Sequence, residues 1–340
     1  MKAFDSWMGD YQVAWRKQYI ASTEWGWQNG KCHPWILPRW LWEAGLWSGI
    51  RSGSNNSLAE YLANNGVQKH EGSHNLKSSW IQCANLCFPF GGSVAGRSLL
   101  AGFLREHVAD EIRSVDAVEL EYEDKDAGLR PAVLLGETGG KRGSGQTSPD
   151  LGILVNEKRG LALVENKLVE KSFYPCSARR TGDSRGRPGN PDPARCDQAL
   201  AVAFDYQSQC HQTVWGRRYW EHLAPVVDND RLSKLAHCPA AHSGYQLFRQ
   251  QALAEGIAAS GKYDFVISCV AADERNETLN SSLKRTRIAE LKDWASLFRG
   301  RARFALFTHQ QWVAWVGTHD AGNRWRDWLA YVESRYGYKP

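Results

Sequence analysis

Two short apolar runs stand close together near the middle of the chain, with a polar turn between them. Residues Leu151 to Val155 are apolar, Asn156 to Gly160 carry turn-forming and charged residues, and Leu161 to Val164 are apolar again. Runs of about four to eight apolar residues that are bounded by turn residues are typical of buried strands. The pattern therefore predicts a hairpin of two short strands.

Periodic segments lie on both sides of this hairpin. From Ser98 to Ile112 an apolar residue recurs at every fourth position, which predicts an amphipathic helix. Val115 to Glu123 alternates apolar and acidic residues and is predicted to be an exposed strand. After the hairpin, the sequence predicts a helix at Gly244 to Ala258, a buried strand at Tyr263 to Val270, a helix at Leu283 to Phe298, a strand at Arg303 to Thr308 and a closing helix at Arg324 to Tyr336.

Charged residues stand at the ends of the two hairpin strands. Asp150 immediately precedes the first strand, and Glu165 and Lys167 end the second. Because side chains alternate between the two faces of a strand, Glu165 and Lys167 point to one face and Asn166 to the other. In a hairpin, the start of the first strand lies across from the end of the second. We therefore expect two carboxylates and one ammonium group to converge there.

This combination of charged groups has a chemical use. Two carboxylates can hold a hard divalent cation such as Mg²⁺, which prefers oxygen ligands. The metal polarises a phosphoryl oxygen and lowers the pKa of a bound water, while a nearby lysine stabilises the negative charge of the transition state. The pattern favours a site for phosphodiester hydrolysis, and the alternative is a surface hairpin with an ordinary salt bridge.

The same residues resemble a known signature. Pro149-Asp150, then fourteen intervening residues, then Glu165-Asn166-Lys167 is similar to the PD-(D/E)xK motif of the restriction-endonuclease-like nuclease superfamily. From about residue 78 to 260, the order of segments resembles a bacterial branch of this superfamily in which cysteines flank the motif. The segments that carry this resemblance are SSWIQCANLCFPFG, ENKLVEKSFYPC, RRYW, HCPA and GYQLFRQQALAEG. The resemblance implies an α/β fold with a mixed sheet flanked by helices. It also implies cleavage of DNA with Mg²⁺ or Mn²⁺, in antiviral defence or restriction.

The resemblance assigns roles to individual residues. It implies catalytic roles for Asp150, Glu165, Lys167 and Gln246, and metal-binding roles for Asp150, Glu165, the main-chain carbonyl of Asn166, and Glu106. Glu106 enters this set because the first core helix of such nucleases often adds an acidic ligand, and Glu111 is the second choice. Gln246 enters because a glutamine on the later core helix often lies near the catalytic lysine. An ordinary polar residue on a helix surface is the alternative for both Glu106 and Gln246.

Composition limits the remaining possibilities. The 340 residues carry a formal net charge of +5, which permits nucleic-acid binding without requiring it. No apolar run approaches about 18 residues, so no membrane span is expected. No N-terminal segment resembles a signal peptide, and we expect a cytoplasmic protein. In that compartment the eight cysteines are expected to be free thiols or metal ligands.

Four cysteines follow the hairpin in a row: Cys176, Cys196, Cys210 and Cys238. Four thiolates can hold a zinc ion or an iron–sulfur cluster. Their spacings are long and include no C-x-x-C pair, so scattered free thiols are the alternative. We expect the four to converge on one structural metal, with zinc favoured over an iron–sulfur cluster.

Basic residues are frequent in the irregular segment from Ser177 to Arg195. Because this segment follows the predicted site closely, its arginines are candidates for phosphate contacts, and a solvated loop is the alternative. Arg249, near the start of the helix predicted at Gly244 to Ala258, is a further candidate. The predicted nucleic-acid-binding residues are Arg179, Arg180, Arg185, Arg187 and Arg249.

Tryptophan is concentrated at the start of the chain, where residues 1–92 hold nine of the 16. We predict a Trp-rich helical N-terminal region over 1–92 that packs on the nuclease core. The alternative is an aromatic platform that stacks on bases. The nuclease domain is predicted over 93–340, with a Cys-rich insertion at about 176–240.

A function of another class is also compatible with the sequence. The chain could be a non-cleaving nucleic-acid-binding or assembly subunit of a defence complex that keeps the nuclease fold. An intact Asp150, Glu165 and Lys167 set argues against this alternative. A nuclease that acts on RNA or on modified bases is a third hypothesis for the function. The expected partner is nucleic acid, and a homodimer or a defence-system partner protein is compatible with it.

Overall fold

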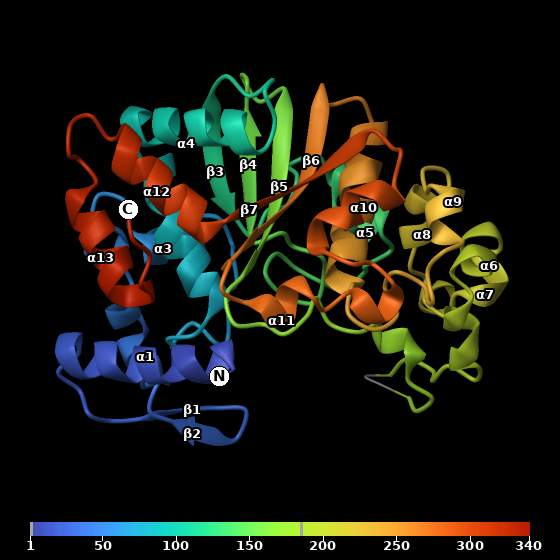
Figure 1. Ribbon diagram of the computed structural model, residues 1–340, viewed down its shortest axis with the longest axis horizontal. Coiled ribbons are helices and arrows are strands. Elements are labelled where there is room, and N and C mark those ends of the chain that lie inside the picture. Colours follow the sequence, from blue (N-terminus) through green and yellow to red (C-terminus); the bar gives the residue numbers. More distant parts are fainter. Residues whose placement is uncertain (1–2, 184–185) are drawn as a thin grey trace.

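A five-stranded mixed sheet forms the centre of the protein (Figure 1). The computed structural model describes residues 3–183 and 186–340. The strands lie in the order β3-β4-β5-β6-β7; neighbours are antiparallel from β3 to β5 and parallel from β5 to β7. Their bounds are β3 Val115–Leu120, β4 Leu151–Val155, β5 Gly160–Lys167, β6 Phe265–Ala272 and β7 Ala302–Thr308.

The predicted hairpin consists of β4 and β5. Its turn, at residues 156–158, has a positive φ at all three positions, and so reverses the chain within a few residues. Leu151 pairs with Val164 in this hairpin. Continuing the register by one step places Asp150 across from Glu165. The turn and the pairing thus bring the two acidic residues to the same end of the sheet.

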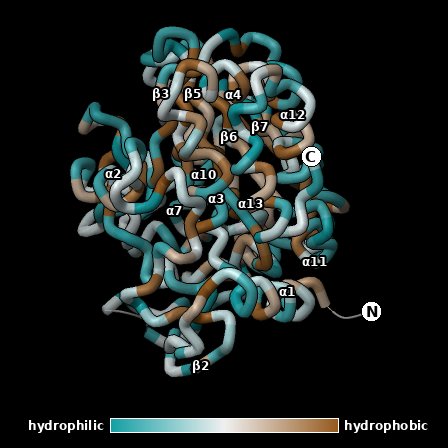
Figure 2. The backbone as a smooth tube through the Cα atoms, turned by 90° about the vertical axis from the view of Figure 1, so that its left-hand side faces the viewer, coloured by the Kyte–Doolittle hydropathy of each residue, from teal (hydrophilic) through white to brown (hydrophobic). Residues whose placement is uncertain are grey.

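Both faces of the sheet are buried. Ile153 and Val164 belong to one hydrophobic cluster, whereas Leu154 and Leu163 belong to a second. The first cluster also contains residues of α3 (Ser79–Gly91), α4 (Val94–His107), α12 (His309–His319) and α13 (Arg326–Tyr336); the second contains residues of α10 (Tyr245–Ala259). Burial of both faces explains why β4 and β5 are continuous apolar runs. Figure 2 shows hydrophobic stretches around β5, β6 and α3 at the centre of the molecule.

The N-terminal region packs against the C-terminal helix. It contains α1 (Phe4–Tyr19), the hairpin of β1 (Gly26–Gln28) and β2 (Lys31–His33), and α2 (Leu58–Asn64). Gln12 on α1 donates a 2.8 Å hydrogen bond to the carbonyl of Arg335 on α13. Tryptophans here are of two kinds. Buried ones include Trp15, Trp42 and Trp80, whereas Trp25, Trp27 and Trp40 are 55%, 63% and 71% exposed.

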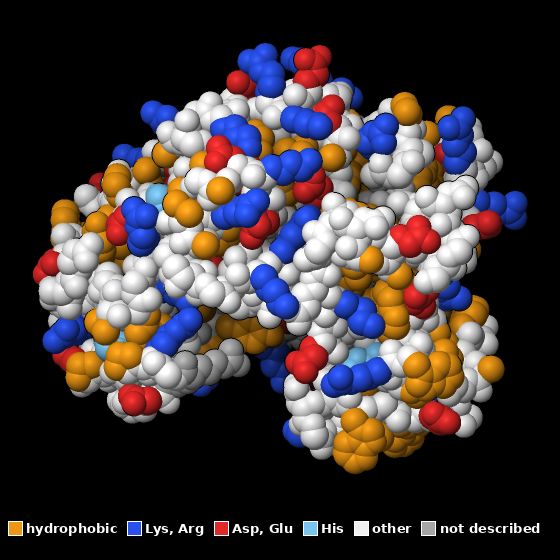
Figure 3. Space-filling view, turned by 180° about the vertical axis from the view of Figure 1, so that it is seen from behind, with side chains coloured by type: hydrophobic (Ala, Val, Ile, Leu, Met, Phe, Trp, Pro, Cys, Tyr) orange, Lys and Arg blue, Asp and Glu red, His pale blue; other side chains and the backbone are white. Residues whose placement is uncertain are grey.

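A long insertion separates β5 from α10. Its short helices are α6 (Ala199–Phe204), α7 (Tyr206–Gln209), α8 (Tyr219–Leu223) and α9 (Asn229–Leu232). Two short helices lie outside the insertion: α5 (Pro131–Leu134) between β3 and β4, and α11 (Glu277–Asn280) between β6 and β7. In Figure 1 the insertion lies on the side of the sheet away from the N-terminal region. Figure 3, which shows the back of the molecule, has a hollow between two protruding parts, with basic side chains at its rim.

The structure differs from the predicted elements in three places. The helix predicted at Ser98 to Ile112 is α4, which begins at Val94 and ends at His107. Leu283 to Phe298 is not one helix but two short 3₁₀ segments, because Arg287 between them has a φ of 67°, which a right-handed helix cannot accommodate. Val115 to Glu123 is not an exposed strand. It becomes β3, which ends at Leu120 and buries Val118 in the cluster that contains α3. Among the described residues, none of the helices is long and apolar enough to cross a membrane.

Candidate active site

Strand alternation sends the charged residues to the α10 face of the sheet. Leu163 on β5 belongs to the cluster that contains α10, so Glu165 and Lys167, two and four positions later, point to that face as well. Leu154 on β4 has the same orientation, and therefore so does Asp150. Acidic and basic groups from two neighbouring strands thus meet beneath the start of α10.

Two short contacts hold the three charged groups together. The Nζ atom of Lys167 lies 2.6 Å from Oε1 of Glu165, and this ion pair is buried. The main-chain amide of Asn166 donates a 2.7 Å hydrogen bond to Oδ2 of Asp150. The structure therefore brings Asp150, Glu165 and Lys167 to one place, as their spacing in the sequence led us to expect.

The side chain of Asn166 points to the opposite face. Its Nδ2 donates to the carbonyl of Ser79 at 2.8 Å and to Oε1 of Gln82 at 2.9 Å, both on α3. The Nε2 atom of His309 lies 2.9 Å from its Oδ1. These buried bonds fix the end of β5 against the helices of the other layer. The main chain of Asn166 stays on the active-site side, because its amide binds Asp150.

Glu121 is a further acidic residue at this place, which the sequence interpretation missed. Its amide donates a 3.0 Å hydrogen bond to the carbonyl of Asp150, so it directly follows β3 where β4 begins. Its side chain is buried, and its φ of 49° is a left-handed value that is uncommon outside glycine. Non-glycine residues in this conformation cluster at functional sites. Glu121, like Glu165, is an acidic residue just after an apolar run, and this pattern could have identified Glu121 from the sequence.

The electrostatics show a local excess of negative charge. Burial raises the pKa of Asp150 to about 8, and neighbouring Glu165 contributes to the rise. Burial also raises the pKa of Glu121 well above its usual range, with Asp150 and Glu165 adding to it. Burial alone would lower the pKa of Lys167, but the surrounding carboxylates raise it. Three carboxylates with one ammonium group make a site that favours an added cation.

A cavity of about 150 Å³ opens above these residues. Its lining includes Asp150, Glu165, Glu121, Gln246, Arg249, His70 and the loop at residues 143–148. The Oε1 atom of Gln246 is buried without a hydrogen-bond partner among the described residues. A small polar cavity lined by three carboxylates and an arginine can accommodate a metal ion with its waters or a phosphate group.

Arg249 is held by a buried polar network. Its Nε donates a 2.9 Å hydrogen bond to Oγ1 of Thr147 and lies 3.5 Å from Oε1 of Glu137. Glu137 also accepts a 2.7 Å hydrogen bond from the hydroxyl of Tyr219. The network fixes the guanidinium group at the cavity and ties α10 to the loop that covers it.

The structure does not bring Glu106 to this site, and the prediction for it is corrected here. Glu106 is exposed on α4. The segment that follows α4 enters β3 at Val115, which pairs with Val155, whereas the site lies at the other end of β3. Six strand residues span roughly 20 Å. Glu111 lies in the same distant region and is ion-paired with Arg303 at 2.8 Å.

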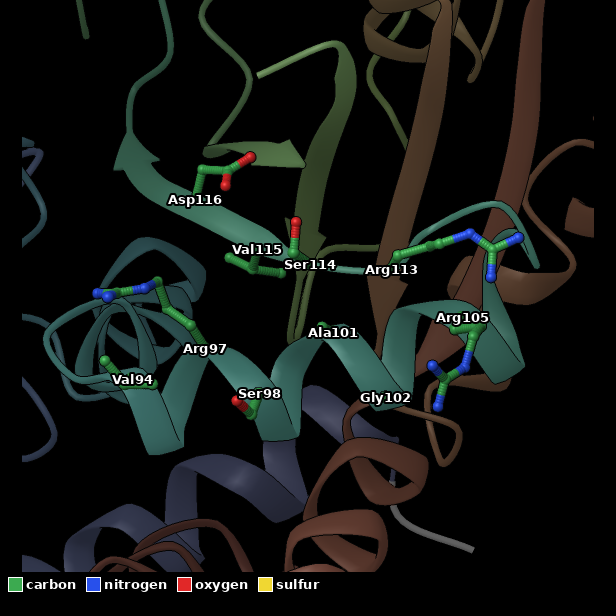
Figure 4. Close-up of a pocket in the computed structure, with 10 residues that line it drawn as sticks. All are labelled: Val94, Arg97, Ser98, Ala101, Gly102, Arg105, Arg113, Ser114, Val115 and Asp116. Atoms are coloured by element: carbon green, nitrogen blue, oxygen red, sulfur yellow. The ribbon is translucent and has the colours of Figure 1, made fainter. Parts of the chain in front are cut away.

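A larger groove lies at that distant end of the sheet. It has a volume of about 430 Å³ and lies between α4 and the start of β3. Figure 4 shows that Arg97 and Arg105 extend from α4 and that Arg113 precedes β3. Its lining contains one carboxylate, that of Asp116, among the described residues. Size alone therefore does not identify the functional cavity, since the groove lacks the paired acidic groups of the smaller one.

The arginines of the basic loop have different surroundings. Arg179 is directed inward, with NH1 2.9 Å from Nδ1 of His242 and NH2 3.5 Å from Oδ1 of Asp197. Arg187 packs over the ring of Trp215, with 5.3 Å between the guanidinium carbon and the ring centroid. Arg180 is exposed. Arg185 lies outside the described residues. Of the predicted phosphate-binding arginines that the structure describes, Arg249 is the one that lines the cavity.

The four cysteines of the insertion come together in its interior. The amide of Cys238 donates a 2.7 Å hydrogen bond to the carbonyl of Cys196, and the amide of Cys176 donates at 3.0 Å to the carbonyl of Ala240. Gln212, two residues after Cys210, donates at 3.1 Å to Sγ of Cys176. All eight cysteines are free thiols. Four distant positions of the sequence are thus gathered at one place.

Comparison with known proteins places the chain in a family. A family model described as restriction endonuclease associating with ARP matches residues 10–337. A search of curated proteins and a search of solved structures each find no match. The match covers nearly the whole chain, including the sheet and the insertion, and it agrees with the mixed sheet flanked by helices. The chain therefore belongs to this restriction-endonuclease-like family.

Proposed function

We propose that this protein is a metal-dependent endonuclease that hydrolyses phosphodiester bonds in DNA, with a role in restriction or antiviral defence. The observation that supports the proposal most is that Asp150, Glu165 and Glu121 line one small cavity, with Lys167 ion-paired to Glu165. The buried carboxylates of Glu121 and Glu165, with the half-buried Asp150 and one ammonium beside them, are costly in a folded protein unless a ligand compensates them. A divalent cation and a phosphate together provide that compensation.

The residues present fit a hard divalent cation such as Mg²⁺ or Mn²⁺. Asp150 and Glu165 offer carboxylate oxygens, Glu121 lines the same cavity, and the main-chain carbonyl of Asn166 lies on the strand that carries Glu165. Oxygen ligands at one polar cavity are the set that Mg²⁺ prefers. When bound, such a metal polarises the phosphoryl oxygen and makes its coordinated water more acidic.

The remaining residues have roles that follow from their positions. Lys167, paired with Glu165 at 2.6 Å, carries a positive charge that stabilises the additional negative charge of the transition state. Arg249, held at the cavity by Thr147 and Glu137, binds a phosphate oxygen and orients the substrate. Gln246 offers its unpartnered amide oxygen to a water or to the metal shell.

DNA is the proposed substrate because the active-site cavity belongs to a basic protein of the restriction-endonuclease-like family. The hollow on the back of the molecule, with basic side chains at its rim, is consistent with a bound nucleic acid (Figure 3). A non-cleaving subunit is the competing function. It would not require a lysine paired with a metal-binding carboxylate, and the presence of Lys167 beside Glu165 favours cleavage.

Incubation of the purified full chain with supercoiled plasmid, linear duplex, single-stranded DNA and RNA tests this function. Each substrate is assayed with Mg²⁺, with Mn²⁺ and with chelator. We expect duplex DNA to be cut with either metal and to remain intact with chelator. Asp150→Asn should abolish cleavage, while Asp116→Asn, at the other end of the sheet, should cut normally. Equal cleavage by the Asp150→Asn protein would refute the assignment.

A further inference from the structure

The Cys-rich insertion contains a second concentration of metal-ligating side chains, away from the carboxylates of the active site. We propose that Cys176, Cys196, Cys210 and Cys238 bind an iron–sulfur cluster. The proposal does not depend on the nuclease function, because it concerns other residues and can be measured without a nucleic acid. Binding requires each thiol to lose its proton to solvent and to donate its Sγ to an iron atom.

Mutual proximity of the four thiols is the first argument. Burial raises the pKa of Cys238, and each of the other three thiols raises it further. Cys176 and Cys196 likewise raise the pKa of Cys210. Cys176 also raises the pKa of Cys196. Every pair among the four is therefore close enough to interact electrostatically. The hydrogen bonds that join the segments of Cys176, Cys196 and Cys238 support the same conclusion.

The separation of the sulfur atoms is the second argument, and it favours a cluster over a single ion. Zinc–sulfur bonds of about 2.3 Å in a tetrahedron place the sulfurs about 3.8 Å apart. Among the described residues, the one group of three or more ligand atoms that all lie within 4.8 Å of one another is Asp197, His237 and His242, with no cysteine in it. The thiols are thus near one another yet too widely spaced for one zinc ion. An iron–sulfur cluster places several irons and sulfides between its cysteines and requires this wider spacing.

The environment of the thiols suits a negatively charged cluster. Cys176 and Cys238 are 9% and 6% exposed, so the centre is shielded from solvent. Arg179 and Arg249 both act to lower the pKa of Cys176, which shows that two guanidinium groups lie near enough to balance the charge of a thiolate. Gln212 supplies a hydrogen bond to the Sγ atom of Cys176. Burial and hydrogen bonds to sulfur are the features that tune such clusters.

The group of Asp197, His237 and His242 does not compete as the metal centre of the insertion. Asp197 is exposed, and its Oδ1 already contacts Nδ1 of His237 at 2.9 Å. The guanidinium of Arg179 contacts both Asp197 and His242, and its positive charge opposes a cation there. These residues instead form a polar group with Arg179, and two of them, Asp197 and His237, are sequence neighbours of Cys196 and Cys238.

A cluster at this place would stabilise the insertion and one wall of the active-site cavity. The segments that carry the four cysteines consist of short helices and irregular chain, so they have few regular hydrogen bonds of their own. Gln212, which contacts Cys176, also donates a 3.0 Å hydrogen bond to the hydroxyl of Tyr245, the first residue of α10. Tyr245 is next to Gln246 of the cavity. Cys176 is therefore linked to one wall of the active-site cavity through Gln212 and Tyr245.

Analysis of the anaerobically purified full chain tests the proposal. We expect about two or about four iron atoms per chain with an equal amount of acid-labile sulfide, as in clusters with four cysteine ligands. We also expect broad visible absorption that bleaches on reduction. Cys210→Ser and Cys238→Ser should lose iron and absorption, while Cys32→Ser, on the distant β2 strand, should retain both. Nuclease assays are not needed for this readout.

The wild-type protein alone decides the question if the serine variants fail to fold. One zinc ion per chain without iron would overturn the cluster in favour of a single-ion site. A metal-free protein that keeps its insertion resistant to proteolysis would overturn the metal site altogether. Full iron content in Cys238→Ser would show that the iron is bound elsewhere.

Discussion

The main-chain amide of Asn166 donates a 2.7 Å hydrogen bond to the carboxylate of Asp150. This bond connects the end of β5 to the residue before β4, so the carboxylate of Asp150 is held in place by the backbone of the neighbouring strand. Because the donor is a main-chain group, no substitution at position 166 other than proline removes it. The carboxylate of Asp150 is therefore oriented before any metal binds, which is the preorganisation that catalysis requires.

Replacing Glu121 distinguishes the acidic ligand that the structure supplies from the one that the sequence suggested. We expect Glu121→Gln to weaken Mn²⁺ binding by about 10-fold or more, since it removes a buried carboxylate beside Asp150. Glu106→Gln is the matched control and should bind Mn²⁺ like the wild type. Calorimetric titration measures both. If Glu106→Gln weakened Mn²⁺ binding more than Glu121→Gln does, Glu106 and not Glu121 would be the metal ligand.

Lys167→Met separates metal binding from chemistry. The methionine keeps much of the length of the side chain but removes the charge, so Mn²⁺ binding should persist. Cleavage should fall by about 10² to 10³, the usual cost of removing one group that stabilises transition-state charge. Single-turnover cleavage together with a metal titration measures the two effects. Lys171→Met, an exposed lysine four residues later, is the control and should be unaffected. Wild-type cleavage by the Lys167 variant would exclude its catalytic role.

The raised pKa of Asp150 predicts a dependence on pH. In the metal-free protein, burial raises this pKa from its usual value of 3.8 to about 8. The folded state therefore binds the proton more tightly than the unfolded state, and the free energy of unfolding should decrease as pH rises from about 4 to about 8. Mg²⁺ requires the ionised carboxylate, so its affinity should increase over the same interval. Urea denaturation with and without Mg²⁺ at several pH values measures both trends.

A variant of Asp150 provides the control for this pH effect. Asp150→Asn has no proton to lose at this position, so its metal-free stability should depend less on pH between about 4 and about 8. An Asp150→Asn protein with the full pH dependence of the wild type would assign the effect to other groups, among which Glu121 is the first to test.

Arg249 is predicted to bind phosphate, and its loss should have an effect that depends on salt. Arg249→Met should weaken DNA binding for all sequences alike and reduce the slope of affinity against salt concentration by about one. Arg303→Met is the control, because Arg303 is also ion-paired with a glutamate but lies at the start of β7, at the far end of the sheet. Fluorescence anisotropy at several salt concentrations, with Ca²⁺ in place of Mg²⁺, gives the slopes. Equal salt-dependence slopes for Arg249→Met and Arg303→Met would show that Arg249 does not contact phosphate.

The two kinds of tryptophan in the N-terminal region should respond differently to substitution. Trp80→Ala should destabilise the protein by about 3–5 kcal/mol, since its side chain is almost completely buried. Trp27→Ala and Trp40→Ala should leave stability nearly unchanged, because both rings are exposed. Thermal unfolding measures these differences. Binding of single-stranded DNA by the Trp27 and Trp40 variants then tests the aromatic platform, which requires a loss of affinity in both.

Local patterns were sufficient to predict the hairpin and three of its charged residues. Glu165 and Lys167 share a face because the strand repeat has a period of two residues, and this holds in any fold in which the segment is a strand. Asp150 joins them because the turn at 156–158 is short. Such features depend on residues that are close in the sequence, and the positions of the strands along the chain followed from the apolar runs for the same reason.

Tertiary structure alone decided which other residues meet at the site. Glu121 follows a strand that looked exposed, and only the packing of α3 on one face and α10 on the other shows that it is buried beside Asp150. Glu106 has the expected residue type and helix, but the register of β3 against β4 places it at the wrong end of the sheet. The spacing of the four thiols likewise depends on how irregular segments fold back on one another. These contacts join residues far apart in the chain, and no local periodicity encodes their distances.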